Sequence, residues 1–308
     1  MNTKLLIYIL KRVLLAIITI FIIATLAFIL MHMIPGGPFN KEKAITEAAM
    51  AALNKKYGLD KPLIEQYFIY LRNLILFNFG PSLKYRGVDV TETIMAGFKT
   101  SALIGGFAIV LAIIFGVVLG SLAAVKRNKW QDKVIMVFTT ACVAMPSFVI
   151  ASILLILFGV KWPIFATRGD SVSGLILPII TLSLYPMSYI TRLSRSSMLD
   201  VLAQDYIRTA LAKGVSQKLI IFKHALKNAL TPVITYAGPM TAFILTGSLV
   251  VEKIFGVAGL GKRFVDSITS RDYPMIMATT VFLAFLVIFM TLISDILYKA
   301  VDPRVRLE

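Results

Sequence analysis

Apolar stretches alternate with shorter polar ones along most of the 308-residue chain. A helix that crosses the hydrocarbon core of a bilayer needs about 20 consecutive, mainly apolar residues. Stretches close to this length occur at residues 13–34, 101–125, 134–160, 175–190, 229–251 and 274–298. The pattern therefore predicts an all-α polytopic membrane protein with six transmembrane helices.

Three basic residues precede the first apolar stretch, an arrangement that is found in secretory signal peptides and also at the start of membrane helices. These residues are Lys4, Lys11 and Arg12. At about 21 residues the stretch exceeds the roughly 7–15 of a signal peptide, so we expect an uncleaved helix. We interpret His32, near its end, as an interfacial side chain in preference to a proton relay.

A long segment of mixed polarity separates the first two apolar stretches. The Pro-Gly-Gly-Pro sequence at residues 35–38 ends the first helix. A helix is then predicted at residues 44–57, stopped by Gly58, and a second one at about residues 62–77. The second is too short and too charged to span, so we expect it at the membrane interface or against the other helices.

Prolines interrupt the later apolar stretches, and kinked helices around a central path suit a transporter. The third and fourth stretches contain Met145-Pro146, Pro178 and Pro186, and the fifth contains Pro239. Polar and aromatic residues on these helices are candidates to line a path: Thr139, Ser147, Tyr185, Ser188, Tyr236 and Thr246. Hydrogen bonding between helices is the alternative for each of them.

The second apolar stretch carries two glycines at the spacing that lets helices approach closely. For Gly116 and Gly120 we favour packing within the chain over a dimer motif.

Composition supports a membrane protein, because 58% of the residues are hydrophobic and only 16% are charged. The net charge of +16 would suggest nucleic acid in a soluble protein. In a membrane protein, cytoplasmic loops and lipid headgroups of the bilayer account for it, so we expect no nucleic-acid partner. The single cysteine, Cys142, cannot form an intrachain disulfide.

Basic residues predict the orientation, because they are enriched in short cytoplasmic loops. With the N-terminus inside, 17 Lys and Arg residues are cytoplasmic. Only 6 lie in the short segments of the opposite side, once the long segment after the first helix is set aside. Both termini and the polar segment at residues 205–232 are therefore expected in the cytoplasm.

One stretch imitates a phosphate-binding loop. Residues 256–262 match G-x-x-x-x-G-K, but Arg263 follows instead of a magnesium-binding Ser or Thr. The stretch also follows a membrane helix and is predicted outside the cell, so we interpret it as a tight re-entrant or capping turn. With two histidines, one cysteine and no H-E-x-x-H or G-x-S-x-G pattern, the sequence favours neither an enzyme nor a metal or cofactor site.

An ion-coupled carrier usually needs an ionisable group within the membrane. The only acidic candidate is Asp295, close to the end of the last helix, where an interfacial position is the simpler interpretation. Energy is then expected from a soluble partner that docks on a cytoplasmic loop. An ion-coupled secondary transporter that works alone remains the alternative.

The polar segment at residues 205–232 contains two short helical patterns that meet at Gly214, a natural helix C-cap. Their apolar positions are Tyr206, Ile207 and Ala210, then Leu219, Ile220, Phe222 and Leu226. The segment resembles the EAA loop of ATP-binding-cassette (ABC) import permeases, with Arg-Thr-Ala at residues 208–210 in place of Glu-Ala-Ala and a late proline, Pro232.

Further motifs extend the resemblance over about 270 residues. They are residues 33–39 (MIPGGPF), 57–62 (YGLDKP), 78–82 (NFGPS), 224–232 (HALKNALTP), 259–261 (GLG), 271–274 (RDYP) and 302–306 (DPRVR). In this order and spacing they resemble the first permease subunit of oligopeptide and dipeptide ABC importers. Residues 80–85 lean towards the oligopeptide type, and nickel, glutathione or sugar remain alternative substrates.

The resemblance implies the type I ABC importer permease fold in the cell (inner) membrane. Residues 1–34 would form the cytoplasmic N-terminus and first transmembrane helix, and residues 35–99 an extracytoplasmic helical segment. Residues 100–308 would form a five-helix core with a cytoplasmic coupling loop at about residues 192–230.

The resemblance also implies partners. A second homologous permease would enclose the peptide path with this chain, two cytoplasmic ATP-binding subunits would hold ATP and magnesium, and an extracytoplasmic peptide-binding protein would deliver peptide. The residues expected to couple the chain to the ATPases are Asp205, Arg208, Ala210, Lys213, Gly214, His224 and Leu226.

Overall fold

The computed structural model describes residues 3–34, 54, 55 and 57–301. The predicted helix at residues 44–57 and the motif at residues 302–306 fall largely or wholly outside these ranges.

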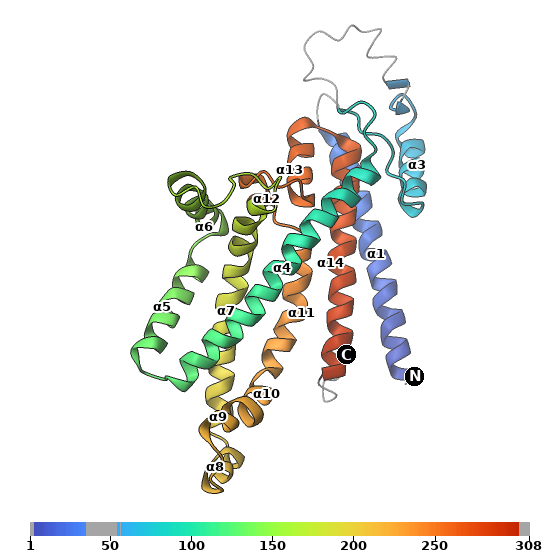
Figure 1. Cartoon of the computed structure of the whole chain (residues 1–308). Coiled ribbons are helices and arrows are strands. Elements are labelled where there is room, and N and C mark those ends of the chain that lie inside the picture. The colour runs from blue at the N-terminus through green and yellow to red at the C-terminus, as the bar shows by residue number, and fades with distance from the viewer. Residues whose placement is uncertain (1–2, 35–53, 56, 302–308) are drawn as a thin grey trace.

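The described part is a bundle of helices with long, steeply inclined members and short ones at both ends (Figure 1). In chain order the elements are α1 (Thr3–Met33), α3 (Leu63–Ile75), α4 (Val90–Val125), α5 (Trp130–Ala144), α6 (Ser147–Leu154), the π-helix η1 (Leu155–Lys161), the 3₁₀ turn η2 (Ser173–Leu175), α7 (Ile176–Leu202), α8 (Asp205–Ala212), α9 (Gln217–Leu219), the π-helix η3 (Ile220–Ala225), α10 (Leu226–Ala229), α11 (Thr231–Leu245), α12 (Leu249–Ile254), α13 (Leu260–Ser270) and α14 (Tyr273–Val301). The predicted all-α architecture is confirmed for these residues.

Five described helices are long and apolar enough to cross a membrane, and a bent pair makes six. The pair is α5 with α6 and η1, which meet at Met145-Pro146 with a bend of 108°. Proline lacks a backbone N–H and disfavours the helical conformation of the residue before it, and Met145 is extended accordingly (φ −84°, ψ 131°). The predicted third helix is therefore a broken span.

The predicted fifth helix is also interrupted, but not at its proline. α11 contains Pro239 and continues to Leu245; the break comes at Gly247, which has a φ of 85°, and α12 follows. The fourth predicted helix is unbroken: α7 contains Pro178 in its first turn and Pro186 in its interior, and runs on to Leu202. Only one of the four proline sites is therefore a helix break.

Several helices extend past the apolar stretches. α4 begins at Val90, eleven residues before the predicted start, because Asp89 caps it by accepting a hydrogen bond from the Glu92 N–H at 3.0 Å. Charged residues are tolerated on the surface of a helix beyond the bilayer, so an apolar pattern misses these turns.

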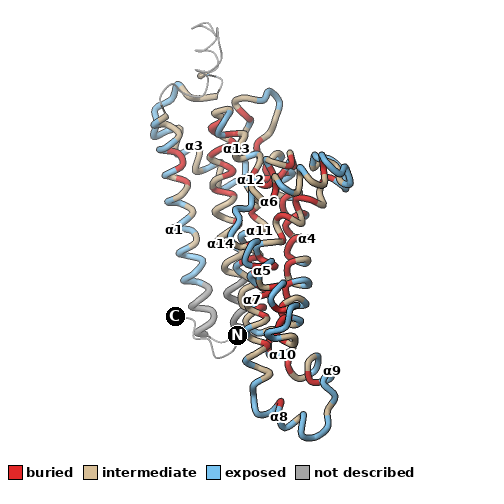
Figure 2. The backbone as a smooth tube through the Cα atoms, turned by 90° about the vertical axis from the view of Figure 1, so that its left-hand side faces the viewer, coloured by how far each residue is buried: buried red, intermediate tan, exposed pale blue. Residues whose placement is uncertain are grey.

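Close packing of α4 on α7 forms the centre of the fold. A Cβ atom at Gly116 would lie 2.7 Å from Ile190 Cγ2, and one at Gly120 would lie 2.5 Å from the Thr191 carbonyl oxygen. The interpretation of these glycines as intrachain packing positions is confirmed. Figure 2 shows the resulting concentration of buried residues along α4 and α7, whereas much of α1 is exposed at the periphery.

The bundle has two distinct ends. The first turn of α1, the last turn of α14 and the segment from α8 to α10 lie together at the lower end in Figure 1, and α3, α12 and α13 lie at the upper end. This arrangement agrees with the predicted topology, in which both termini and the coupling loop share one side.

Buried carboxylates hold the upper end together. Glu252 of α12 is fully buried and accepts hydrogen bonds from Ser101 Oγ at 2.6 Å and from the Lys262 N–H at 3.1 Å. Asp272 is also fully buried and accepts from Ser82 Oγ and, at 3.2 Å, from the Leu83 N–H.

The stretch that resembles a phosphate-binding loop also lies at the upper end of the bundle. Residues 256–259 lie in the turn between α12 and α13, Gly259 is the N-cap of α13, and residues 260–262 are its first turn. The predicted capping turn is confirmed.

Asp266 on α13 accepts hydrogen bonds from Lys253 and Lys262. Partial burial raises the pKa of this carboxyl, but the two ammonium groups outweigh burial, so its pKa lies below its usual value.

Candidate functional site

The candidate site is the coupling segment, residues 205–229, which comprises α8, α9, η3 and α10. It projects below the ends of α5 and α11 at the lower end of the bundle (Figure 1). The expected loop of residues 192–230 is shorter than predicted, because residues 192–202 are the last turns of α7. α7 therefore leads directly into the site.

A Schellman motif turns the chain between α8 and α9. Gly214 adopts a left-handed conformation with a φ of 79°, its N–H donates to the Leu211 carbonyl at 3.0 Å, and the Val215 N–H donates to the Ala210 carbonyl at 3.2 Å. This is the hydrogen-bond pattern that ends a helix at a glycine. The predicted C-cap role of Gly214 is confirmed.

The inner face of the coupling segment is fixed to the bundle by an apolar cluster. Ile207 of α8, Ile220 and Ala225 of η3 are buried together with Met198 of α7 and Ala124 of α4. Burying a large aliphatic side chain contributes roughly 1.5–3 kcal/mol. The segment is consequently attached to α4 and α7 by packing, in addition to its chain connection to α7.

The outer face carries exposed apolar side chains. Phe222 is 71% exposed, and Tyr206, Leu211 and Leu219 are also exposed. Asn228 Nδ2 donates to the Tyr206 hydroxyl at 2.8 Å, which ties α10 to α8. Exposed apolar side chains gathered on one short segment at the end of a membrane bundle make that segment a candidate protein interaction surface.

The predicted coupling residues are divided between these two faces. Asp205 and Arg208 are exposed and form a loose ion pair at 3.6 Å, and Lys213 is exposed as well. Ala210 is partly buried and packs on the inner apolar cluster. His224 and Leu226 are half-buried in η3 and at the start of α10.

A buried ion pair beside the coupling segment was missed by sequence reasoning. Arg195 of α7 donates to Asp132 of α5 through Nε at 2.7 Å and Nη2 at 2.8 Å, and the Asn128 N–H donates to the same carboxylate at 2.9 Å. The Asp132 side chain is almost completely buried. The pair joins the N-terminal end of α5 to α7 just before the site.

The candidate path residues do not form one set. Thr139, Ser188 and Thr246 are buried, and the Thr139 and Thr246 hydroxyls donate to carbonyls of their own helices, Met136 and Phe243. In this conformation the three residues are not accessible, but these hydrogen bonds lie within single helices and Ser188 Oγ has no partner among the described residues, so the hydrogen bonding between helices considered above is not observed for them.

The remaining path candidates are accessible. Ser147 is exposed at the start of α6, Tyr185 is exposed on α7, and Tyr236 is half-buried on α11. Tyr236 stacks on Tyr189, which sequence reasoning overlooked although it follows Tyr185 by one helical turn.

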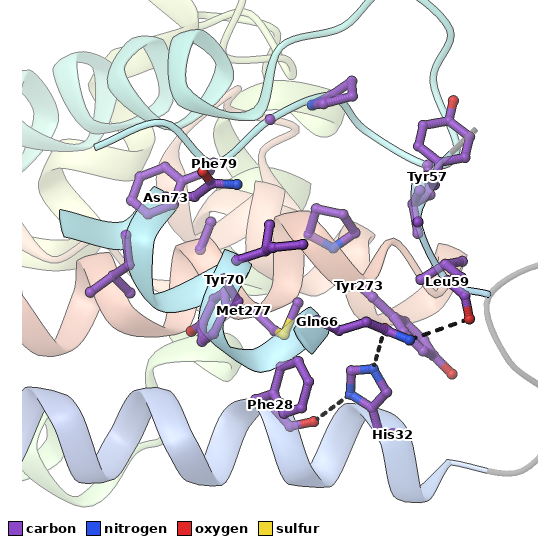
Figure 3. Close-up of a pocket in the computed structure, with 18 residues that line it drawn as sticks. Phe28, His32, Tyr57, Leu59, Gln66, Tyr70, Asn73, Phe79, Tyr273 and Met277 are labelled. Atoms are coloured by element: carbon purple, nitrogen blue, oxygen red, sulfur yellow. Dashed lines mark hydrogen bonds between the residues drawn. The ribbon is translucent and has the colours of Figure 1, made fainter. Parts of the chain in front are cut away.

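A cavity of about 220 Å³ lies at the opposite end, between α1, α3 and α14 (Figure 3). His32 contacts the Phe28 carbonyl at 2.8 Å and Gln66 Oε1 at 3.2 Å, and Gln66 Nε2 donates to the Leu59 carbonyl at 3.3 Å. His32 thus links α1 to α3. No group of three His, Cys, Asp or Glu residues within the described ranges is placed to bind a metal ion.

Two family models match the chain. Residues 116–307 match the model of the binding-protein-dependent transport system inner membrane component, and residues 5–82 match the corresponding N-terminal model.

Similar curated proteins cover nearly the whole chain. The dipeptide transport system permease protein DppB of Bacillus subtilis is 47% identical over 98% of both chains. The oligopeptide transport system permease protein OppB of Haemophilus influenzae and the DppB protein of Lactococcus lactis are each 42% identical over 97% of this chain and 99% of theirs. The chain therefore belongs to the family of inner membrane components of binding-protein-dependent transport systems and has the type I permease fold of ABC importers.

Proposed function

We propose that this chain is a membrane permease subunit of an ATP-driven peptide importer. It forms half of a translocation path with a second homologous permease, and two cytoplasmic ATP-binding subunits dock on the coupling segment. A peptide-binding protein on the other side delivers the substrate. The names of the similar proteins, which are dipeptide and oligopeptide permeases, support peptide as the substrate class.

The observation that carries this proposal is the two-faced coupling segment. Its inner face is packed on α4 and α7, and its outer face exposes Phe222 and neighbouring apolar residues at the end of the bundle shared by both terminal helices. A force applied to the outer face must therefore act on α7, because the buried cluster leaves the segment no independent movement without loss of packing.

The surroundings of the segment suit docking of a soluble subunit. Exposed Arg208 and Lys213 supply positive charge that orients an approaching partner, and the apolar residues supply contact area. The ion pair between Asp132 and Arg195 extends the moving unit to α5. ATP-driven closure of the subunits then tilts α5 and α7 together, a rigid-body form of coupling.

The experiment that tests the function is reconstitution in lipid vesicles. This chain is purified with the second permease, the two ATP-binding subunits and the binding protein, and uptake of a labelled dipeptide and a labelled tetrapeptide is measured. We expect uptake only with hydrolysable ATP and with all partners present.

Two results would contradict the proposal. Peptide uptake by this chain alone, driven by a proton or sodium gradient, would identify an ion-coupled carrier. Uptake of nickel, glutathione or a sugar by the complete complex, without uptake of either peptide, would leave the importer mechanism intact and refute the substrate class.

A further inference from the structure

Three tyrosines gather on one face formed by α7 and α11. The rings of Tyr189 and Tyr236 stack with centroids 4.1 Å apart and an interplanar angle of 25°. Tyr185 precedes Tyr189 by four residues and so lies on the same face of α7. Tyr185 is 51% exposed, Tyr189 is 42% exposed and Tyr236 is half-buried. We call these three residues the tyrosine patch.

Tyr185 lies deep within the membrane-spanning region, whereas Tyr189 and Tyr236 lie nearer one end of their spans, Tyr236 five residues after the span of α11 begins at Thr231. The span that contains α7 begins at Ser173, and Tyr185 comes twelve residues later. At 1.5 Å per residue this places Tyr185 about 18 Å along the span, near the middle of a hydrocarbon core about 30 Å thick. Tyrosines that face lipid are concentrated at the membrane surfaces instead.

Within the described ranges no hydrogen bond joins the hydroxyl groups of the patch to another residue; the hydroxyls of Tyr67 and Tyr206 have such a partner, and those of Tyr70 and Tyr273 do not. An unpaired hydroxyl in hydrocarbon is energetically costly. The depth of Tyr185, together with the exposure and the unpaired hydroxyls of the patch, indicates that this face of α7 and α11 contacts something polar instead of lipid.

We propose that the tyrosine patch is a peptide-binding surface within the translocation path, an inference that rests on the proposed function as a peptide permease. A phenol hydroxyl both donates and accepts, so it pairs with the N–H or the carbonyl of any main-chain amide. The ring faces of Tyr185 and Tyr189 offer apolar contact to side chains of varied shape. Recognition of the main chain fits a carrier whose substrates share a backbone and little else.

The test removes the hydroxyls and keeps the rings. Tyr185→Phe, Tyr189→Phe and Tyr236→Phe, singly and combined, are assayed in the complete vesicle-reconstituted complex, with a labelled tetrapeptide. A hydrogen bond contributes about 0.5–1.5 kcal/mol net, so each substitution is expected to raise the transport KM about 2- to 12-fold. Tyr70→Phe, which removes a buried hydroxyl on α3, is the matched control and leaves KM unchanged.

A second measurement connects the hydroxyls to the main chain. A tetrapeptide analogue with one amide replaced by an ester lacks one main-chain N–H. Wild-type complex is expected to show a higher KM for the analogue than for the peptide, and the triple Phe variant to show a smaller difference, as in a double-mutant cycle.

Three outcomes are informative. If the wild-type complex imports peptide and the KM of the triple variant is within twofold of the wild-type KM, the tyrosine patch proposal is overturned and the proposed function stands. Loss of the second permease from the purified triple variant also overturns it, since the patch is then a contact between permeases. Absence of ATP-dependent peptide import by the wild-type complex refutes the proposed function itself.

Discussion

Replacement of Gly214 tests the coupling segment with a cost that can be worked out from its backbone. Gly214 has a φ of 79°, and a Cβ atom added there would have no other atom within 4 Å. A Cβ atom at this position therefore clashes with nothing, and its penalty comes from the left-handed backbone alone, about 1–2 kcal/mol. This corresponds to a factor of about 5–30 in the population of the turn.

The matched control is Gly87, which lies at the other end of the molecule before α4. It has a φ of 75° and equally open surroundings. Gly214→Val and Gly87→Val thus impose the same local strain at opposite ends. We expect both proteins to insert into the membrane, but only Gly214→Val to lose ATP-dependent peptide uptake and co-purified ATP-binding subunits. Gly214→Asn, which tolerates the left-handed conformation, should retain most of both activities.

Equal uptake and equal recovery of ATP-binding subunits for the two valine variants would refute this reasoning. The Schellman turn would then be an ordinary surface feature, and the orientation of α8 relative to η3 would have no part in coupling.

Three further predictions concern charged groups. Asp132→Ala strands the Arg195 guanidinium and should lower the free energy of unfolding in detergent by about 3 kcal/mol, whereas Asp132→Ala combined with Arg195→Met should recover most of it; a single variant as stable as wild type would contradict this. Glu252→Gln replaces an acceptor of backbone hydrogen bonds and should lower the free energy of unfolding by about 1–3 kcal/mol. Faster amide hydrogen exchange at the start of α13 is the local measurement of this loss. The pKa of Asp266 is lowered in the folded protein, so its carboxylate stabilises the fold at pH values above the pKa of about 3.9 in the unfolded chain. This contribution is lost as the pH falls through the pKa in the folded protein. Because Asp266 is 30% exposed, the loss should be below about 1 kcal/mol, and the thermal stability of Asp266→Asn should lack this acid-dependent step.

The spans were predictable because a bilayer imposes one length and one composition on any helix that crosses it. The ends were not, because polar turns such as the first turns of α4 and the last turns of α7 lie beyond the apolar stretch and continue the helix. The bend at Pro146 carried a local signal. The break at Gly247 did not stand out, since a single glycine is compatible with a membrane helix.

In the candidate site, too, features that depend on neighbouring residues were predictable, whereas contacts between residues far apart in the sequence were not. The turn at Gly214 follows from neighbouring residues, so its helix-capping role was predictable. The pairing of Asp132 with Arg195 joins residues that are 63 positions apart, and no local pattern indicates it. Tyr189 carried a signal in its one-turn spacing from Tyr185, but its stacking on Tyr236 depends on how α7 meets α11.

The central claim, that the coupling segment is the docking surface for cytoplasmic ATP-binding subunits, is tested most directly by site-specific cross-linking. The chain has a single natural cysteine, Cys142, which is buried and can be replaced by alanine. A thiol-reactive photocross-linker is then attached to Phe222→Cys on the coupling segment, or to Val172→Cys, which is exposed at the opposite end. In the assembled complex we predict covalent products with the ATP-binding subunits from position 222 and none from position 172. Products from position 172, or their absence from position 222 in every nucleotide state, would contradict the account.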